Sequence, residues 1–174
     1  MRELALPLSA QDIASLKAFD HIQLSGSLYV GRDQVHKRLY DLLQQGEDLP
    51  ISLTGESIYY MGPSPAPEGS LIGSCGPTTS ARMDPFSPCL LDHGLSVMIG
   101  KGDRSPKVIE AIGRNKAIYL QAFGGCGALY ASTVRAVQTV AFPELGPEAL
   151  LRLTVERFPV IVAIDSLMGS VFAR

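Results

Sequence analysis

The stretch Gly73-Ser-Cys-Gly-Pro-Thr-Thr-Ser-Ala-Arg-Met-Asp84 sets the expectations for the rest of the chain. A short strand is predicted at 70–72, ended by the Gly-Pro pair. Two adjacent hydroxyls, Thr78 and Thr79, follow, and Arg82 comes one helical turn later. A Gly-Pro turn into a helix start leaves backbone N–H groups unpaired, which is a geometry that binds anions. Two interpretations fit equally well: a threonine that caps a helix beside a solvent-exposed arginine, or one wall of an anion site.

Composition and length limit the class of protein. The 174 residues are 46% hydrophobic and 18% charged, so the chain can bury a core, and we expect one domain over residues 1–174. A net charge of -2 and the lack of a basic run argue against a nucleic-acid-binding protein. No apolar segment approaches the roughly 18 residues of a membrane span. The N-terminus does not resemble a signal peptide, so a cytoplasmic protein is expected.

The cysteines are few and widely spaced. Cys75, Cys89 and Cys126 are an odd number, which argues against a disulfide framework. The histidines show no metal-ligand spacing, so no metal is expected on this chain. A site in which the three thiolates hold an iron–sulfur cluster is arithmetically possible. Buried or loop cysteines are the favoured interpretation.

Predicted helices and strands alternate along the chain. Ser9 is expected to cap a first helix, a strand follows at 21–25, and a glycine-containing loop at 25–31 leads into a helix from 33 to Gly46. A Pro-rich loop is expected at 62–69. Further strands are predicted at 51–61, 95–100, 117–122, 134–142, 151–155 and 160–164, and further helices at 84–91, 106–112 and 143–150. This order predicts an α/β fold with a mixed central sheet, in which the apolar last strand is central.

Three predicted strand-to-helix turns each carry a cation beside glycine or proline: Arg32, Arg82 and Lys101. Such turns gather at one edge of an α/β sheet, where ligands bind. Arginine can grip a carboxylate with two hydrogen bonds, so three cations there would suit a small dicarboxylate. Each cation taken alone is explained as well by solvent exposure. Thr78 and Thr79 add hydroxyls, although an alcohol is a poor base unless nearby cations stabilise its alkoxide. No catalytic triad is evident, so the chain is interpreted as half of an active site.

Seven sequence blocks together resemble the β subunit, or C-terminal domain, of the iron–sulfur-dependent class I fumarate hydratases and L-tartrate dehydratases. The blocks are Leu24-Ser-Gly-Ser-Leu-Tyr-Val-Gly-Arg-Asp33, His36-Lys-Arg-Leu39, Ile58-Tyr-Tyr-Met-Gly-Pro63, Gly76-Pro-Thr-Thr-Ser-Ala-Arg-Met-Asp84, Met98-Ile-Gly-Lys-Gly-Asp-Arg-Ser105, Glu144-Leu-Gly146 and Phe158-Pro-Val-Ile-Val-Ala-Ile-Asp165. They cover nearly the whole chain, and the Gly-Pro-Thr-Thr and Gly-Lys-Gly blocks are specific in combination.

The resemblance implies a swivelling β/β/α domain and a hydro-lyase that hydrates fumarate reversibly to L-malate. In this family a 4Fe–4S cluster is held by three cysteines of the α subunit or N-terminal domain, and the enzyme assembles as α2β2 or as a dimer of fused chains. The residues matching Arg32, Arg82 and Lys101 grip the substrate carboxylates. The residue matching Thr78 is the proposed base, and the one matching Thr79 contacts the substrate. The acid partner lies in the other subunit.

Two features depart from the family pattern or leave alternatives open. Ala81 stands where many fumarases have glycine, and ligand status is not carried over to the cysteines of this chain. Fumarate is preferred over tartrate because the segments 59–63, 82–84 and 102–105 look more fumarase-like. The alternatives are the β subunit of an L-tartrate dehydratase, which converts tartrate to oxaloacetate, and an anion-binding module without catalysis.

Overall fold

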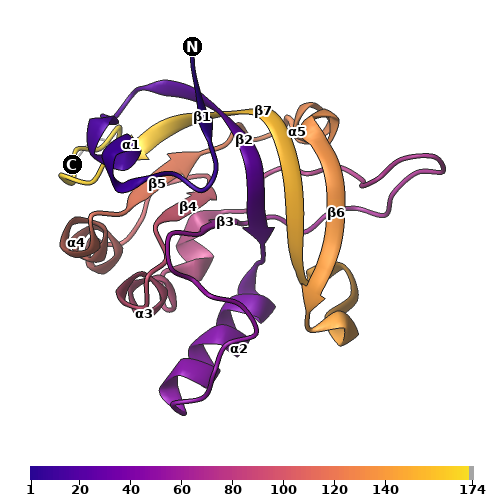
Figure 1. The fold of residues 1–174 in the computed structure, drawn as a ribbon, viewed down its shortest axis with the longest axis horizontal. Helices are drawn as coiled ribbons and strands as arrows, with labels where there is room; N and C mark the ends of the chain where they lie inside the picture. The colour runs from indigo at the N-terminus through magenta and orange to yellow at the C-terminus, as the bar shows by residue number, and fades with distance from the viewer. Residues whose placement is uncertain (173–174) are drawn as a thin grey trace.

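A computed structural model describes residues 1–172 (Figure 1). The elements in chain order are β1 (Arg2–Ala5), α1 (Ala10–Ser15), β2 (His21–Val30), α2 (Asp33–Gln44), β3 (Ser57–Tyr59), the 3-10 helix η1 (Ser80–Met83), α3 (Ser87–Asp92), β4 (Val97–Gly100), α4 (Pro106–Asn115), β5 (Ile118–Gln121), α5 (Gly127–Thr133), β6 (Val134–Ala141), the 3-10 helix η2 (Pro143–Glu148) and β7 (Leu150–Ile164). None of the helices in this described part is long and apolar enough to cross a membrane.

The strands form one mixed sheet in the order β1-β2-β3-β4-β5-β7-β6. The first five run parallel, and β7 runs antiparallel to β2, β5 and β6. Because β7 also pairs with β2, from His21↔Ile161 to Val30↔Leu151, the sheet closes into a barrel-like core. The predicted mixed α/β fold is therefore confirmed, and so is the central position of the last strand.

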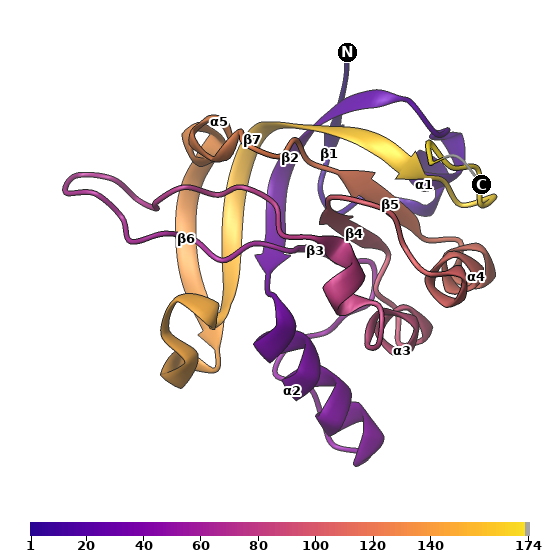
Figure 2. The ribbon, with the colours of Figure 1, turned by 180° about the vertical axis from the view of Figure 1, so that it is seen from behind.

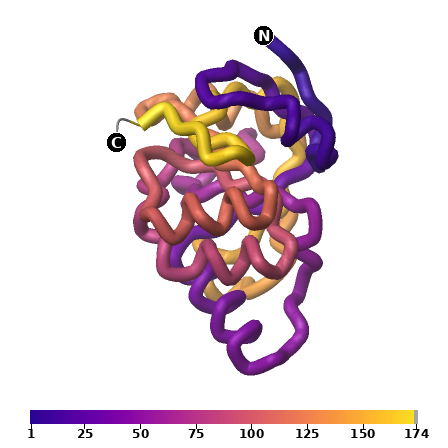
Figure 3. Tube along the Cα trace, turned by 90° about the vertical axis from the view of Figure 1, so that its left-hand side faces the viewer, coloured from indigo at the N-terminus to yellow at the C-terminus, as the bar shows by residue number. Residues whose placement is uncertain are grey.

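Alternate residues of the strands face two separate cores, as the two-residue period of a strand requires. In β4, Val97 and Ile99 belong to the interior of the barrel, whereas Met98 belongs to the outer core beneath the helices. Helices α2, α3 and α4 cover this outer face, and the helices of residues 87–115 face the viewer in Figure 3. Two buried faces explain why these strands are continuously apolar.

Strand β2 is longer than predicted. The glycine-containing segment expected as a loop continues the strand to Val30, with a register shift between Leu24 and Gly26. Gly26 has φ +133, and a Cβ atom there would clash with the backbone of Leu6. Glycine therefore permits a close approach of the strand to Leu6, rather than a turn.

Strand β7 replaces two predicted strands. Phe158 and Pro159 between them remain paired with β2, whereas Glu156 and Arg157 form a bulge in which Arg157 takes a positive φ of 55. The Arg157 amide donates a hydrogen bond to Oγ of Ser25, the β2 residue opposite this bulge (3.0 Å). The two long strands are thus irregular at matching positions, which allows one strand to pass where the sequence pattern indicated a break.

Residues 60–78 contain neither helix nor strand, so the strand predicted at 70–72 is wrong, and the strands predicted over 51–61 are reduced to β3. The chain instead forms an arm of two limbs that projects past β6 (Figures 1 and 2). Prolines remove hydrogen-bond donors from one limb, and Gly73 packs against Ser64 so closely that a Cβ atom would overlap the Ser64 carbonyl. The helix predicted at 84–91 begins later, as α3.

Candidate functional site

Three parallel strands end at the same edge of the sheet and bring together the predicted site residues. Arg32 follows β2 and occupies the N-cap position of α2. Lys101 directly follows β4. The amide of Thr78 donates to the carbonyl of Tyr60, which follows β3 (2.7 Å). The predicted gathering of cations and hydroxyls at one sheet edge thus corresponds to the observed topology.

The turn that carries the threonines lies directly on the end of β4. Thr79 forms an isolated parallel bridge with Lys101, and the Ser80 amide donates to the Lys101 carbonyl (2.9 Å). A Cβ atom at Gly100 would overlap the Ser80 hydroxyl. Glycine at position 100 is therefore required for the turn to reach the lysine.

Neither threonine caps a helix. Thr79 occupies the N-cap position of η1, but its side chain makes no capping hydrogen bond. Thr78 is half-buried, and within residues 1–172 its hydroxyl has no hydrogen-bond partner. The capping interpretation of these residues is contradicted, and both hydroxyls are available to a ligand.

Arg32 lies between the root of the arm and a distant acid. Its Nη2 pairs with Glu148 Oε1 of η2 at 2.5 Å, and its Nε is buried without a partner. The guanidinium packs against Gly62, where a Cβ atom would lie 2.5 Å from its Cζ. The folded chain thus leaves this donor unpaired, which is uncommon for a buried polar atom.

Arg82 pairs with the first residue of α2. Its Nε and Nη2 both donate to Asp33 Oδ2, at 3.1 and 2.7 Å. Both side chains are partly exposed, and such pairs contribute only about 0–1 kcal/mol. An incoming carboxylate can therefore replace or join Asp33 at low cost. Lys101 makes no ion pair with any described residue, and its side chain lies beside Gly124.

The acids Asp33 and Glu148 were not singled out from the sequence. Asp33 directly follows Arg32, so the sequence does show this acid beside a predicted site residue. Glu148 lies 116 positions from Arg32, and no local pattern could have paired them. In this structure two of the three cations have acidic partners, and the third has none within the described residues.

A buried ion pair between Arg104 and Asp84 lies next to the turns that carry the site residues. The side chain of Arg104 is fully buried, and its Nε donates to Asp84 Oδ1 at 2.7 Å while its Nη2 donates to Ser87 Oγ at 2.8 Å. The guanidinium also lies over the rings of Tyr60 and Tyr119, at 5.3 and 4.9 Å from their centroids. Hydrogen bonds and cation–π contacts together compensate the burial of this charge.

Buried polar residues around this ion pair also connect the threonine turn and the Lys101 turn. Asp84 directly follows η1, and its Oδ2 accepts from the Ser105 amide at the start of α4 (2.9 Å). The Tyr119 hydroxyl hydrogen-bonds to Ser80 Oγ (2.8 Å) and to the Gly102 carbonyl (2.6 Å). The threonine turn and the Lys101 turn are therefore held to one another by buried polar groups.

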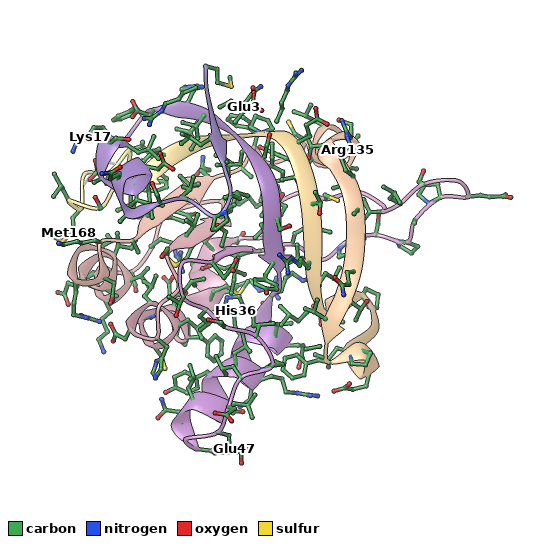
Figure 4. The ribbon with its side chains drawn as sticks, in the orientation of Figure 1. Glu3, Lys17, His36, Glu47, Arg135 and Met168 are labelled. Carbon is green, nitrogen blue, oxygen red and sulfur yellow. The ribbon has the colours of Figure 1, made fainter. Side chains whose placement is uncertain are left out.

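His36 fixes the backbone of Arg32. Its ring lies at the end of α2 nearest the sheet (Figure 4), with Nδ1 2.7 Å from the Arg32 carbonyl. Nδ1 therefore carries the proton and donates, and Nε2 is buried without a partner. Burial lowers the pKa of His36 from its ordinary 6.5 to about 4, and the Arg104 charge acts in the same direction.

This depressed pKa predicts a pH dependence of stability. Between pH 6.5 and about 4 the unfolded chain binds a proton at His36 that the folded chain does not, so stability falls as the pH falls through this window. The full effect is about 3 kcal/mol. Urea unfolding of the wild type and of His36→Leu at several pH values measures it. Between pH 6.5 and about 4, the free energy of unfolding of His36→Leu should depend less on pH than that of the wild type. An equal pH dependence in both proteins would contradict the lowered pKa of His36.

The thiols do not form a site for an iron–sulfur cluster. Cys75 is buried and donates to the Gly73 carbonyl (3.3 Å), and burial raises the pKa of its thiol to about 11. Cys89 lies on α3, whereas Cys126 precedes α5. Over the described part of the chain, no three of His, Cys, Asp and Glu are placed to hold a metal ion. The residues present therefore do not fit a cluster, and no chemical step is assigned to one on this chain.

Comparison with known proteins places this arrangement in a family. The model of the family described as "Fumarase C-terminus" matches residues 2–174. The chain belongs to this family. The matched segment includes every residue of the candidate site, from Arg32 to Glu148.

Individual relatives differ in length. The chain is 37% identical over 167 residues to "Fumarate hydratase class I, anaerobic" of Escherichia coli K12, covering 95% of this chain and 30% of that protein. It is 35% identical over 166 residues to "Fumarate hydratase 2" of Leishmania major, covering 94% of this chain and 29% of that protein. It is 36% identical over 171 residues to "Putative L(+)-tartrate dehydratase subunit beta" of Methanocaldococcus jannaschii, covering 95% of this chain and 88% of that protein. The chain thus spans about 30% of the fumarate hydratases that it matches.

Proposed function

We propose that this chain is the β subunit of a hydro-lyase that reversibly hydrates fumarate to L-malate, at a site shared with a cluster-bearing α subunit in an α2β2 assembly. The observation that carries the proposal is the sheet edge at which the turns bearing Arg32, Arg82 and Lys101 meet the turn of Thr78, whose hydroxyl has no hydrogen-bond partner among residues 1–172. Membership of the fumarase C-terminus family and the relatives' names support it.

The cations serve to bind the two substrate carboxylates. Arg82 presents Nε and Nη2 on one edge, a geometry suited to bidentate binding of a carboxylate, and both atoms now donate to the single oxygen Oδ2 of Asp33. Arg32 supplies a second guanidinium, whose side chain is partly exposed. Lys101 supplies a compact charge close to Thr79, whose hydroxyl contacts the substrate. Together these groups hold a dicarboxylate with its carbon chain beside Thr78.

Thr78 serves as the base in the direction from malate to fumarate. Its oxygen takes a proton from the carbon next to one carboxylate, the electron pair of that C–H bond forms the C=C bond, and hydroxide leaves the neighbouring carbon. Nearby cations stabilise both the threonine alkoxide and the charge that develops on the carboxylate. The 4Fe–4S cluster is assigned to the α subunit, because this chain's residues do not fit a cluster. The acid that protonates the leaving hydroxide is assigned to the α subunit as well, as the resemblance to the family implies.

A second candidate function is that of an L-tartrate dehydratase β subunit. The specific observation in its favour is the Methanocaldococcus relative, which is a separate subunit of similar length, so that 88% of it is matched. A dicarboxylate clamp serves either substrate. Discrimination depends on partners for the extra hydroxyl of tartrate.

Reconstitution with a cluster-bearing α subunit under anaerobic conditions tests the proposal. Turnover of fumarate and L-malate, with little turnover of L-tartrate, is the expected result. Turnover of L-tartrate alone would move the assignment to the second candidate. If the assembled complex turns over neither, while the isolated chain binds malate tightly in calorimetry, the chain is a non-catalytic anion-binding module instead.

A further inference from the structure

The arm of residues 62–77 begins and ends at the candidate site. Gly62 packs against the guanidinium of Arg32, and the last residue of the arm precedes Thr78. Between these roots the arm projects past β6 (Figures 1 and 2), and every residue from 64 to 71 is exposed. A surface that is continuous with an incomplete site faces whatever chain completes that site.

Several hydrogen bonds fix the base of the arm. The Tyr59 hydroxyl donates to the Cys75 carbonyl, and the Cys75 amide donates to the Gly127 carbonyl of α5 (3.1 Å). The two limbs are joined where the Ser74 amide donates to Ser64 Oγ (2.8 Å) and the Ser64 amide donates to the Ser74 carbonyl (3.3 Å). Three prolines restrict the first limb further. A preorganised loop loses less conformational entropy when it binds.

The exposed surface of the arm is almost uncharged and includes the apolar side chains of Pro65, Ala66, Pro67 and Leu71. Leu71 is 60% exposed, and Glu68 is the one charged residue between 62 and 77. A hollow lies between the arm and Val137, Pro147 and Leu151 on one flank. A second hollow, on the other flank, is lined by the arm and by small residues of α5, among them Ala128 and Ala131. Apolar surface of this kind, with few charges at its centre, is typical of protein–protein interfaces.

We propose that this arm and its two flanking hollows dock the α subunit, which presents a largely apolar, weakly charged surface to them. The inference rests on the proposed function. The α subunit is favoured over a second copy of this chain as the partner of the arm for two reasons. Both roots of the arm belong to the site that the α subunit completes. In addition, the Escherichia coli relative carries, in one polypeptide, more than two thirds of its length outside the matched segment, which is enough protein to cover this face.

The test compares two leucines of similar exposure. Leu71→Asp places a charge in the proposed interface, whereas Leu167→Asp, at a position 72% exposed in the turn after β7, is the matched control. Binding of each variant to the purified α subunit is measured by calorimetry, and the oligomeric state of each variant alone by light scattering. Leu71→Asp should weaken binding by about tenfold or more, because truncating or charging a central apolar anchor has effects of this size. Leu167→Asp should bind like the wild type, and thermal unfolding of both isolated variants should match it.

Three outcomes would overturn the proposal: wild-type affinity in Leu71→Asp, no binding of the α subunit by the wild-type chain, or loss only of a self-association of the isolated chain, which would make a second copy the occupant. Binding is measured without turnover, so a complex that Leu71→Asp disrupts but that hydrates no substrate would leave the docking surface standing and would refute the proposed reaction alone.

Discussion

Replacing Thr78 with valine is expected to lower kcat of the assembled enzyme by about 100- to 10,000-fold, the range typical of losing a positioned proton-transfer group, while KM changes little. Valine keeps the shape of threonine and removes only the hydroxyl. The backbone of Thr78 remains held by the Tyr60 carbonyl, and its hydroxyl has no partner among the described residues that the change would strand. Initial rates with fumarate and with L-malate give both parameters.

Two matched variants separate the roles of the neighbouring threonines. Thr78→Ser retains a hydroxyl and should recover a large part of kcat. Thr79→Val removes a proposed substrate contact and should act chiefly on KM, because Thr79 lies beside Lys101 and does not transfer the proton. If Thr78→Val raises KM and spares kcat, Thr78 is a binding group and the base lies elsewhere.

The gathering of the site was predictable because it depends on local rules. A cation that follows an apolar strand and lies beside glycine marks the end of that strand. Because parallel strands end at one edge of the sheet, the sequence predicts that Arg32 and Lys101 lie at the same edge. The acid Glu148 was not predictable in this way, since it meets Arg32 through the closure of the barrel by β7 and β6. Electrostatic partners from distant elements depend on tertiary structure, which a single sequence does not encode as a pattern.

The incorrect strand predictions also result from tertiary structure that the sequence pattern does not show. Glycine in 25–31 and the polar residues before Phe158 suggested breaks, yet β2 and β7 pass through both because each strand's irregularity faces the other's. Local propensity was overridden by pairing between strands more than 100 residues apart. The arm was misread for the opposite reason. The apolar pair Leu71-Ile72 resembled a strand, but within residues 1–172 it pairs with no strand.

Replacing Arg104 with methionine is expected to destabilise the chain by about 3–5 kcal/mol, the usual cost of removing one partner of a buried ion pair. Methionine fills part of the space, but Asp84 is then left as an uncompensated charge close to the core, and the contacts with Ser87 and the two tyrosine rings are lost. Urea unfolding of the isolated chain measures the difference in the free energy of unfolding.

A double variant shows whether the unpaired charge is the cause. Arg104→Met with Asp84→Asn removes both charges, while an asparagine Oδ1 can still accept the Ser105 amide at the start of α4. The double variant should therefore be more stable than Arg104→Met alone, an explicit departure from additivity. Equal or greater destabilisation in the double variant would show that packing between the tyrosine rings, rather than charge pairing, makes Arg104 important.

Loss of Arg104 should also affect the candidate site, because Asp84 and Tyr119 connect its two turns. Asp84 ends the turn that carries Thr78 and Arg82, and Tyr119 bonds both that turn and the Gly102 carbonyl beside Lys101. Arg104→Lys keeps a positive charge near Asp84 but cannot donate to Asp84 and Ser87 with one planar group. A folded Arg104→Lys enzyme should therefore bind its dicarboxylate with a raised KM, because the two cation-bearing turns are no longer fixed at one spacing. A variant that loses stability but keeps the wild-type KM would show that the buried layer supports the fold without setting the geometry of the clamp.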